Sequence, residues 1–141
     1  MTQAQIFVLV NVFGGISVLG SYLLGLVYYP ELRMNLWGGV DGIWKTIFSM
    51  SMLPAAAGYL LFFYYMVFKS GLDGFEHDVV LLRHLPSILC AVFLISASVW
   101  MPSTLAYLSG NSTLWWNVAV VSLWITAISL LLLALSIAFQ H

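Results

Sequence analysis

The chain has 141 residues, of which 62% are hydrophobic and 6% are charged, and its formal net charge is −1. Soluble domains carry about a quarter of their residues as Asp, Glu, Lys or Arg, so this composition excludes an ordinary water-soluble globule and indicates an integral, multi-pass membrane protein. The 4 Lys and Arg residues are scattered, which excludes a basic surface for nucleic acid, and the single Cys90 excludes an internal disulfide.

Four apolar stretches are each long enough to cross a hydrocarbon core of about 30 Å, which takes about 20 helical residues. They cover residues 5–29, 46–68, 85–107 and 115–139. Backbone polar groups must pair internally within lipid, so each stretch is expected to be a helix. Short connections force neighbouring helices to run antiparallel. The sequence therefore predicts an all-α integral membrane fold, a four-transmembrane-helix up-down bundle in which residues 1–141 form one membrane domain.

Small residues recur at helical spacing on the first predicted helix, and the second carries another beside three alanines. These residues are Gly14, Ser17, Ser21, Gly25 and Gly58. In lipid, small side chains allow two helices to approach closely, so we expect these positions to pack against other helices. Asn11, a carboxamide well inside the first span, is expected to contact a neighbouring helix as well.

The second connection carries the clustered ionisable groups of the chain. They are Asp73, Glu76, His77, Asp78, Arg83 and His84. Their spacing matches no strong metal-ligand signature, so the sequence predicts no metal site there. The favoured interpretation is a solvated loop in which acidic residues begin the next helical segment.

Aromatic residues gather toward the end of the bundle that holds the first and third connections. The candidate ligand-binding set is Tyr28, Trp37, Trp44, Trp100, Trp115 and Trp116. An interfacial aromatic belt explains such residues in most membrane proteins. Two alternatives stay open, namely a pocket for a flat apolar or cationic ligand and a contact with a partner protein.

An internal similarity links the same two connections. Residues 28–44 align without a gap on residues 100–116, and the matched pairs are Pro30 with Pro102, Leu36 with Leu108, Gly38 with Gly110 and Trp44 with Trp116. The offset is about half the chain. This pattern is typical of a duplicated unit, and it predicts a possible tandem repeat of two helical hairpins, residues 1–72 and 73–141.

Function is constrained mainly by what the predicted spans do not contain. None has an ionisable residue at mid-depth, whereas proton-coupled transport, ion pumping and bis-His haem binding normally need one. We therefore predict no catalytic residues and no cofactor, apart from a possible hydrophobic ligand or lipid. The leading hypothesis is a membrane component that works with copies of itself or with other membrane proteins. The alternatives are a binder or transporter of an apolar or aromatic molecule (a lipid, sterol, tetrapyrrole or quinone) and an uncoupled pore.

In its small size and abundant tryptophan the chain is similar to the tryptophan-rich sensory and translocator proteins. That resemblance implies a five-helix bundle that binds porphyrins and sterol-like ligands. The chain has four expected spans, however, and the Trp-Pro motifs of that family do not align with its residues. No residue role is carried over from that family.

Overall fold

The computed structural model describes residues 2–69, 71–72, 75, 79–110 and 112–139. Within them lie four long helices of 26 residues each: α1 Gln3–Tyr28, α2 Ile43–Phe68, α4 Leu85–Gly110 and α5 Thr113–Ala138. Each is long and apolar enough to cross a membrane, since 26 residues of α-helix span about 39 Å. The predicted all-helical architecture with four candidate spans is confirmed, and every helix begins and ends within about one turn of its predicted bounds.

Three short helical elements lie in the described parts of the connections. Between α1 and α2 are η1 (Pro30–Leu32) and η2 (Asn35–Trp37), and α3 (Val80–Arg83) precedes α4. Arg33 folds back on the end of α1, where its Nε and Nη2 donate hydrogen bonds of 2.9 and 2.7 Å to the Leu26 carbonyl oxygen. A cation at a helix C-terminus satisfies free carbonyl groups and complements the helix dipole. The first connection is therefore anchored to α1.

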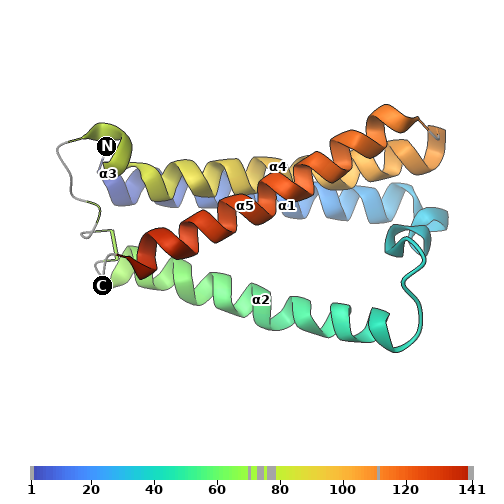
Figure 1. Cartoon of the computed structure of the whole chain (residues 1–141), viewed down its shortest axis with the longest axis horizontal. Helices are drawn as coiled ribbons and strands as arrows, with labels where there is room; N and C mark the ends of the chain where they lie inside the picture. Colours follow the sequence, from blue (N-terminus) through green and yellow to red (C-terminus); the bar gives the residue numbers. More distant parts are fainter. Residues whose placement is uncertain (1, 70, 73–74, 76–78, 111, 140–141) are drawn as a thin grey trace.

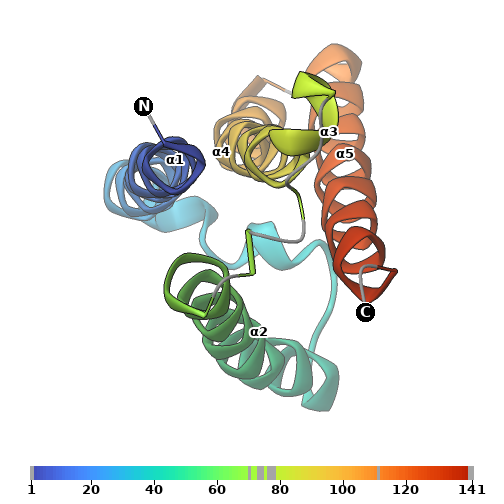
Figure 2. The ribbon, with the colours of Figure 1, turned by 90° about the vertical axis from the view of Figure 1, so that its left-hand side faces the viewer.

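Helices α1, α4 and α5 form a layer with α4 in the middle, and α2 lies against one side of this layer (Figure 2). The start of α1 and the end of α5 lie at one end of the molecule, and the first and third connections lie at the other (Figure 1). Helix α4 packs along both α1 and α5, whereas α1 and α2 share few contacts. The two predicted hairpins are thus packed differently, and their descent from a tandem repeat stays a prediction.

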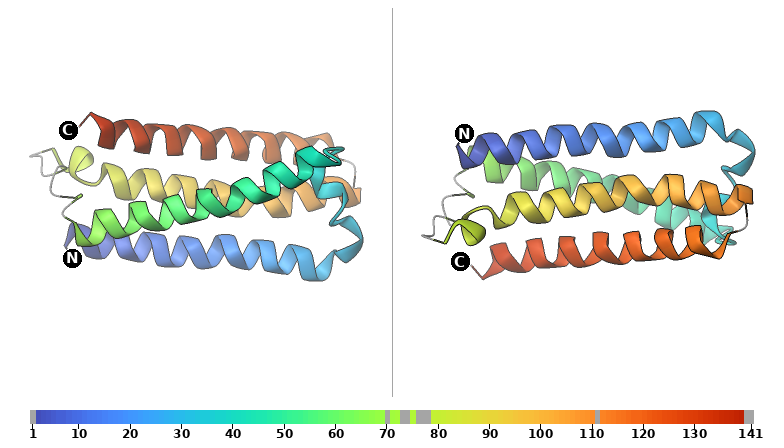
Figure 3. Two further views of the ribbon diagram at one scale, coloured as in Figure 1. Left: turned by 90° about the horizontal axis from the view of Figure 1, so that it is seen from below. Right: turned by 90° about the horizontal axis from the view of Figure 1, so that it is seen from above.

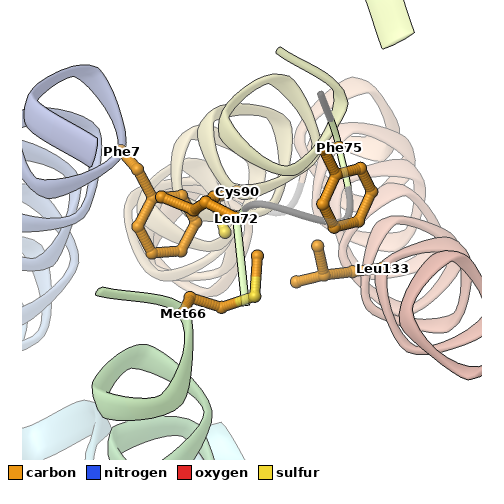
Figure 4. Close-up of a cluster of buried hydrophobic side chains, with 6 residues drawn as sticks. All are labelled: Phe7, Met66, Leu72, Phe75, Cys90 and Leu133. Atoms are coloured by element: carbon orange, nitrogen blue, oxygen red, sulfur yellow. The ribbon is translucent and has the colours of Figure 1, made fainter. Parts of the chain in front are cut away.

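The most buried apolar cluster sits at the end of the molecule where α2 meets the layer (Figure 4). All four long helices contribute to it, as does the segment that follows α2. Its members are Phe7, Met66, Leu72, Phe75, Cys90 and Leu133. The expectation of a solvated second connection concerned its ionisable residues, whereas its apolar residues Leu72 and Phe75 are buried, with 5% and 2% exposure. These two side chains fill the space between α2 and the layer.

The ionisable residues of the second connection are only partly accounted for by the structure. Asp73, Glu76, His77 and Asp78 lie outside the described residues. Arg83 ends α3 and His84 follows it, immediately before α4. The carbonyl oxygen of Arg83 accepts a hydrogen bond from the Gln3 side-chain amide, which ties α3 to the start of α1.

Close approach of two backbones holds α1 against α4. A Cβ atom added at Gly14 would lie 2.5 Å from Leu94 Cδ1, and one added at Gly25 would lie 2.8 Å from Leu105 Cδ1. Separations this short are not tolerated between carbon atoms. A larger residue at Gly14 would displace α4, because Leu94 Cβ also lies 2.7 Å away, whereas at Gly25 it would displace the side chains of Leu105 and Met101. The α1–α4 pair therefore depends on these two glycines.

Hydroxyl groups join α4 to α5. The Oγ of Ser96 and the Oγ1 of Thr126 are 2.8 Å apart and share a hydrogen bond between the helices. The buried side chains of Ser122 and Ser129 donate instead to carbonyl groups of their own helix, those of Ala119 and Ile125. These bonds satisfy polar atoms that would otherwise be costly in an apolar surrounding.

Candidate functional site

The candidate site is a groove between the second half of α1 and the end of α4. It has a volume of about 880 Å³ and is open to the outside along its length. The residues that line it are Ile16, Ser17, Gly20, Ser21, Leu24, Gly25, Tyr28, Tyr29, Pro102, Leu105, Ala106 and Ser109. Four of the residues singled out in the sequence therefore lie in one groove, three as helix-packing positions and Tyr28 as a ligand-binding position.

The five predicted helix-packing residues occupy different settings. Gly14 lies against α4, Ser17 and Ser21 line the groove, Gly25 does both, and Gly58 has open space around it on α2. Positions 14 and 25 are about three turns apart and lie on the same side of α1, whereas Ser17, three residues after Gly14, is rotated by about 60° from that side. The small residues of α1 therefore reach from the α4 contact into the groove.

The shape of the groove follows from its small residues. A Cβ atom at Gly20 would meet nothing within 4 Å, so this part of α1 presents bare backbone to the outside. The hydroxyl of Ser21 donates to the Val18 carbonyl oxygen at 2.8 Å, and that of Ser109 donates to the Ala106 carbonyl oxygen at 3.3 Å. Because these hydroxyls are bonded to their own helices, the surface of the groove is mainly apolar. Its deepest part is formed by the α1 backbone at Gly20.

The predicted tryptophans each have separate surroundings. Trp37 lies in η2, where Lys45 Nζ is 5.4 Å from the centre of its ring. Trp44 is exposed in the first turn of α2. Trp115 and Trp116 are exposed in the first turn of α5, and the Trp116 ring lies 5.2 Å from that of Tyr107.

Trp100 lies deeper in the molecule than its place near the third connection implies. The sequence predicts that α4 ends at residue 107, but the helix continues to Gly110 with Pro102 in its interior. Trp100 is therefore about three turns from the end of α4, and its ring makes an edge contact with Tyr22 at 5.8 Å. Among the described residues, each ring contact that involves a Trp joins it to a Tyr and not to another Trp.

A second polar feature lies where α1, α2 and α4 meet. The Tyr59 hydroxyl donates a hydrogen bond of 2.5 Å to Asn11 Oδ1, and it lies 3.9 Å from Cys90 Sγ. Asn11 Nδ2 in turn donates to the Phe7 carbonyl oxygen at 2.8 Å. Asn11 is thus seen to contact a neighbouring helix. Its partners Tyr59 and Cys90 were missed, since neither differs in sequence from a residue that faces lipid.

No group of three or more His, Cys, Asp or Glu side chains lies close enough together to hold a metal within the described part of the chain. Buried polar atoms without a hydrogen-bond partner there are His84 Nδ1 and Ser87 Oγ, at the start of α4. Comparisons with protein-family models, curated proteins and solved structures find no match for this chain.

Proposed function

We propose that the protein is a non-catalytic, multi-pass component of a membrane that associates through its helix faces with a second copy or with another membrane protein. Large hydrophobic side chains are exposed on all four long helices. Water does not tolerate apolar surface on this scale, whereas hydrocarbon does. Membrane insertion explains this surface without any further partner, but it does not explain the groove.

The groove between α1 and α4 is the observation that carries the proposal. Lipid is as apolar as a leucine side chain, so helices in a bilayer associate through close packing of small residues. Ser17, Gly20 and Ser21 form such a surface, and no other helix in the described part of the chain covers it. A transmembrane helix laid along the groove would approach the α1 backbone at Gly20 as closely as α4 does at Gly14.

Filling the groove is expected to reduce association. In Gly20→Leu, a large side chain occupies the concave floor, and we expect the crosslinked fraction in native membranes to fall about tenfold, which corresponds to about 1.4 kcal/mol. Gly15→Leu is the matched control, since Gly15 also has open space around it on α1 but does not line the groove. Equal crosslinking of the two variants, or a wild-type chain recovered solely as a monomer, contradicts the proposal.

A second candidate function, a binder of an apolar small molecule, is favoured by the size of the same groove. Ligand pockets commonly measure about 300–1,000 Å³, and the groove holds about 880 Å³ with Tyr28 and Tyr29 at one end. Native mass spectrometry of the detergent-purified monomer is expected to show a bound lipid-sized mass in the wild type and in Gly15→Leu. The mass is expected to be absent from Gly20→Leu. A bare monomer in all three proteins argues against this function.

A further inference from the structure

Helix α2 is held to the other helices at one end only. Its last part contributes to the packed end of the molecule, where Met66 is buried and the Phe62 and Phe63 rings lie 6.1 and 5.9 Å from the Phe7 ring. From Ile43 to Gly58, every side chain is exposed except two that are partly exposed. The views in Figures 1 and 3 show α2 near α1 at its end and away from the layer at its start.

The interface between α2 and α4 continues beyond the point where the two helices part. The Tyr59 and Phe93 rings are 5.4 Å apart at the last close contact. Because α2 and α4 run antiparallel, positions four, seven and eleven residues before Tyr59 face positions four, seven and eleven residues after Phe93. On α2 these are Ala55, Met52 and Phe48, and on α4 they are Ala97, Trp100 and Thr104.

These two sets of residues form matching surfaces of one interrupted interface. The α2 set is exposed, and on α4 Trp100 and Thr104 are partly exposed. Both surfaces are apolar apart from the hydroxyl of Thr104, which already donates to the Trp100 carbonyl oxygen at 2.9 Å. The α4 surface continues the interface that α2 and α4 already form at the packed end. The start of α2 is therefore the segment that fits this surface.

Two joints allow α2 to move without loss of its packed end. Pro54 lies inside α2, and it has no N–H to bond the Met50 carbonyl, so the helix bends more easily there. The connection that leads into α2 contains Gly38, Gly39 and Gly42 with φ of 57°, 87° and 61°. Glycine adopts these conformations freely. Among the described residues of the segment between the two joints, Lys45 contacts the first connection, with its Nζ 5.4 Å from the centre of the Trp37 ring and 3.5 Å from Met34 Sδ, so a swing of this segment has to break this exposed contact.

We propose that α2 is a movable helix with two positions. The part from Tyr59 to Phe68 stays fixed through the Tyr59–Asn11 hydrogen bond and the aromatic contacts with Phe7. The part from Ile43 to Leu53 swings about Pro54 between the open position of Figure 1 and a closed position against Trp100 of α4. Opening and closing would expose and cover the Tyr22–Trp100 pair. This motion does not depend on the proposed association or on a ligand in the groove.

Spin-label distances in nanodiscs that hold one copy of the chain test this motion. The labels replace Met50 and Val99, which are both exposed, in a Cys90→Ala background. We expect two distance populations, the second shorter by roughly 5 Å, about half a helix diameter. The reference pair, Leu61 with Ile95, lies at the fixed end and is expected to give one population in every variant, which reports that the fold is intact.

The hinge is tested by restoring the missing N–H. Pro54→Ala is expected to leave one Met50–Val99 population, whereas Pro102→Ala, the same change in α4, is expected to keep both. A single population in the starting protein, as narrow as that of the reference pair, overturns the proposal, as does persistence of both populations in Pro54→Ala. Either result leaves the crosslinking of Gly20→Leu unaffected, so failure of the motion and failure of the proposed association are separable.

Discussion

Phe7→Ala is expected to lower the free energy of unfolding by about 3 kcal/mol. Phe7 is 0% exposed and packs edge-on against Phe62 and in a stacked contact with Phe63. Truncation leaves a cavity at the point where α1 meets α2, and the lost contacts are not replaced. The lower end of the range for Phe→Ala applies because lipid is as apolar as the core, so the transfer term is small.

Reversible unfolding in mixed micelles, followed by tryptophan fluorescence, measures this effect. The control is Phe13→Ala on the same helix, because the Phe13 side chain is 69% exposed and its loss leaves no cavity. We expect the control to change the unfolding free energy by less than about 0.5 kcal/mol. Similar losses for both variants would mean that the packed end of the molecule does not stabilise the fold.

Gly14→Ala and Gly15→Ala are expected to change stability in opposite directions, although the two residues are adjacent. At Gly14 the added methyl group would lie 2.5 Å from Leu94 Cδ1 and 2.7 Å from Leu94 Cβ. The Cβ atom cannot rotate away, so α1 and α4 must separate, which we expect to cost about 1–3 kcal/mol. At Gly15 a Cβ atom meets nothing within 4 Å. There the better helix propensity of alanine stabilises by up to about 1 kcal/mol.

The same unfolding assay compares the two alanine variants. A partly compensating variant strengthens the comparison. Leu94→Ala removes the Cγ and Cδ atoms that the new methyl group meets but keeps the Cβ atom, so the double variant Gly14→Ala/Leu94→Ala is expected to recover part of the clash and to lose less than the sum of the single changes. Strict additivity, or a Gly14→Ala variant as stable as Gly15→Ala, would show that α1 and α4 are not in close contact at this position.

The long helices could be predicted from sequence because length and composition decide them. Twenty or more apolar residues bounded by Gly, Pro or polar residues leave few alternatives to a helix. The end of α4 was predicted three residues early. The predicted span of residues 85–107 already contained Pro102, and α4 continues to Gly110, which places Trp100 about three turns from its end.

Packing between the helices could be predicted only in part. Gly14 and Gly25 were singled out as packing residues and do lie against α4. Glycine can be recognised in the sequence as a position where a second helix can approach closely, because it has no side chain. The open position of α2 was not predictable, since α2 is nearly as apolar as its neighbours and its sequence does not mark a buried side. The burial of Leu72 and Phe75 was missed for a related reason. Isolated apolar residues in a polar connection are often exposed, so their sequence context does not indicate burial.

The pairing of α1 with α4 has a consequence for biosynthesis. Helices α1 and α2 are synthesised first, yet they share few contacts. The extensive contacts of α1 are with α4, so they can form only after α4 has been synthesised. Contacts between distant parts of a chain form late. The α4–α5 hairpin, which is extensively packed by itself, then acts as the template on which the earlier helices assemble. Truncation after α2 would leave a pair of helices whose described contacts lie at one end, in the Phe7 ring contacts and the Tyr59–Asn11 hydrogen bond.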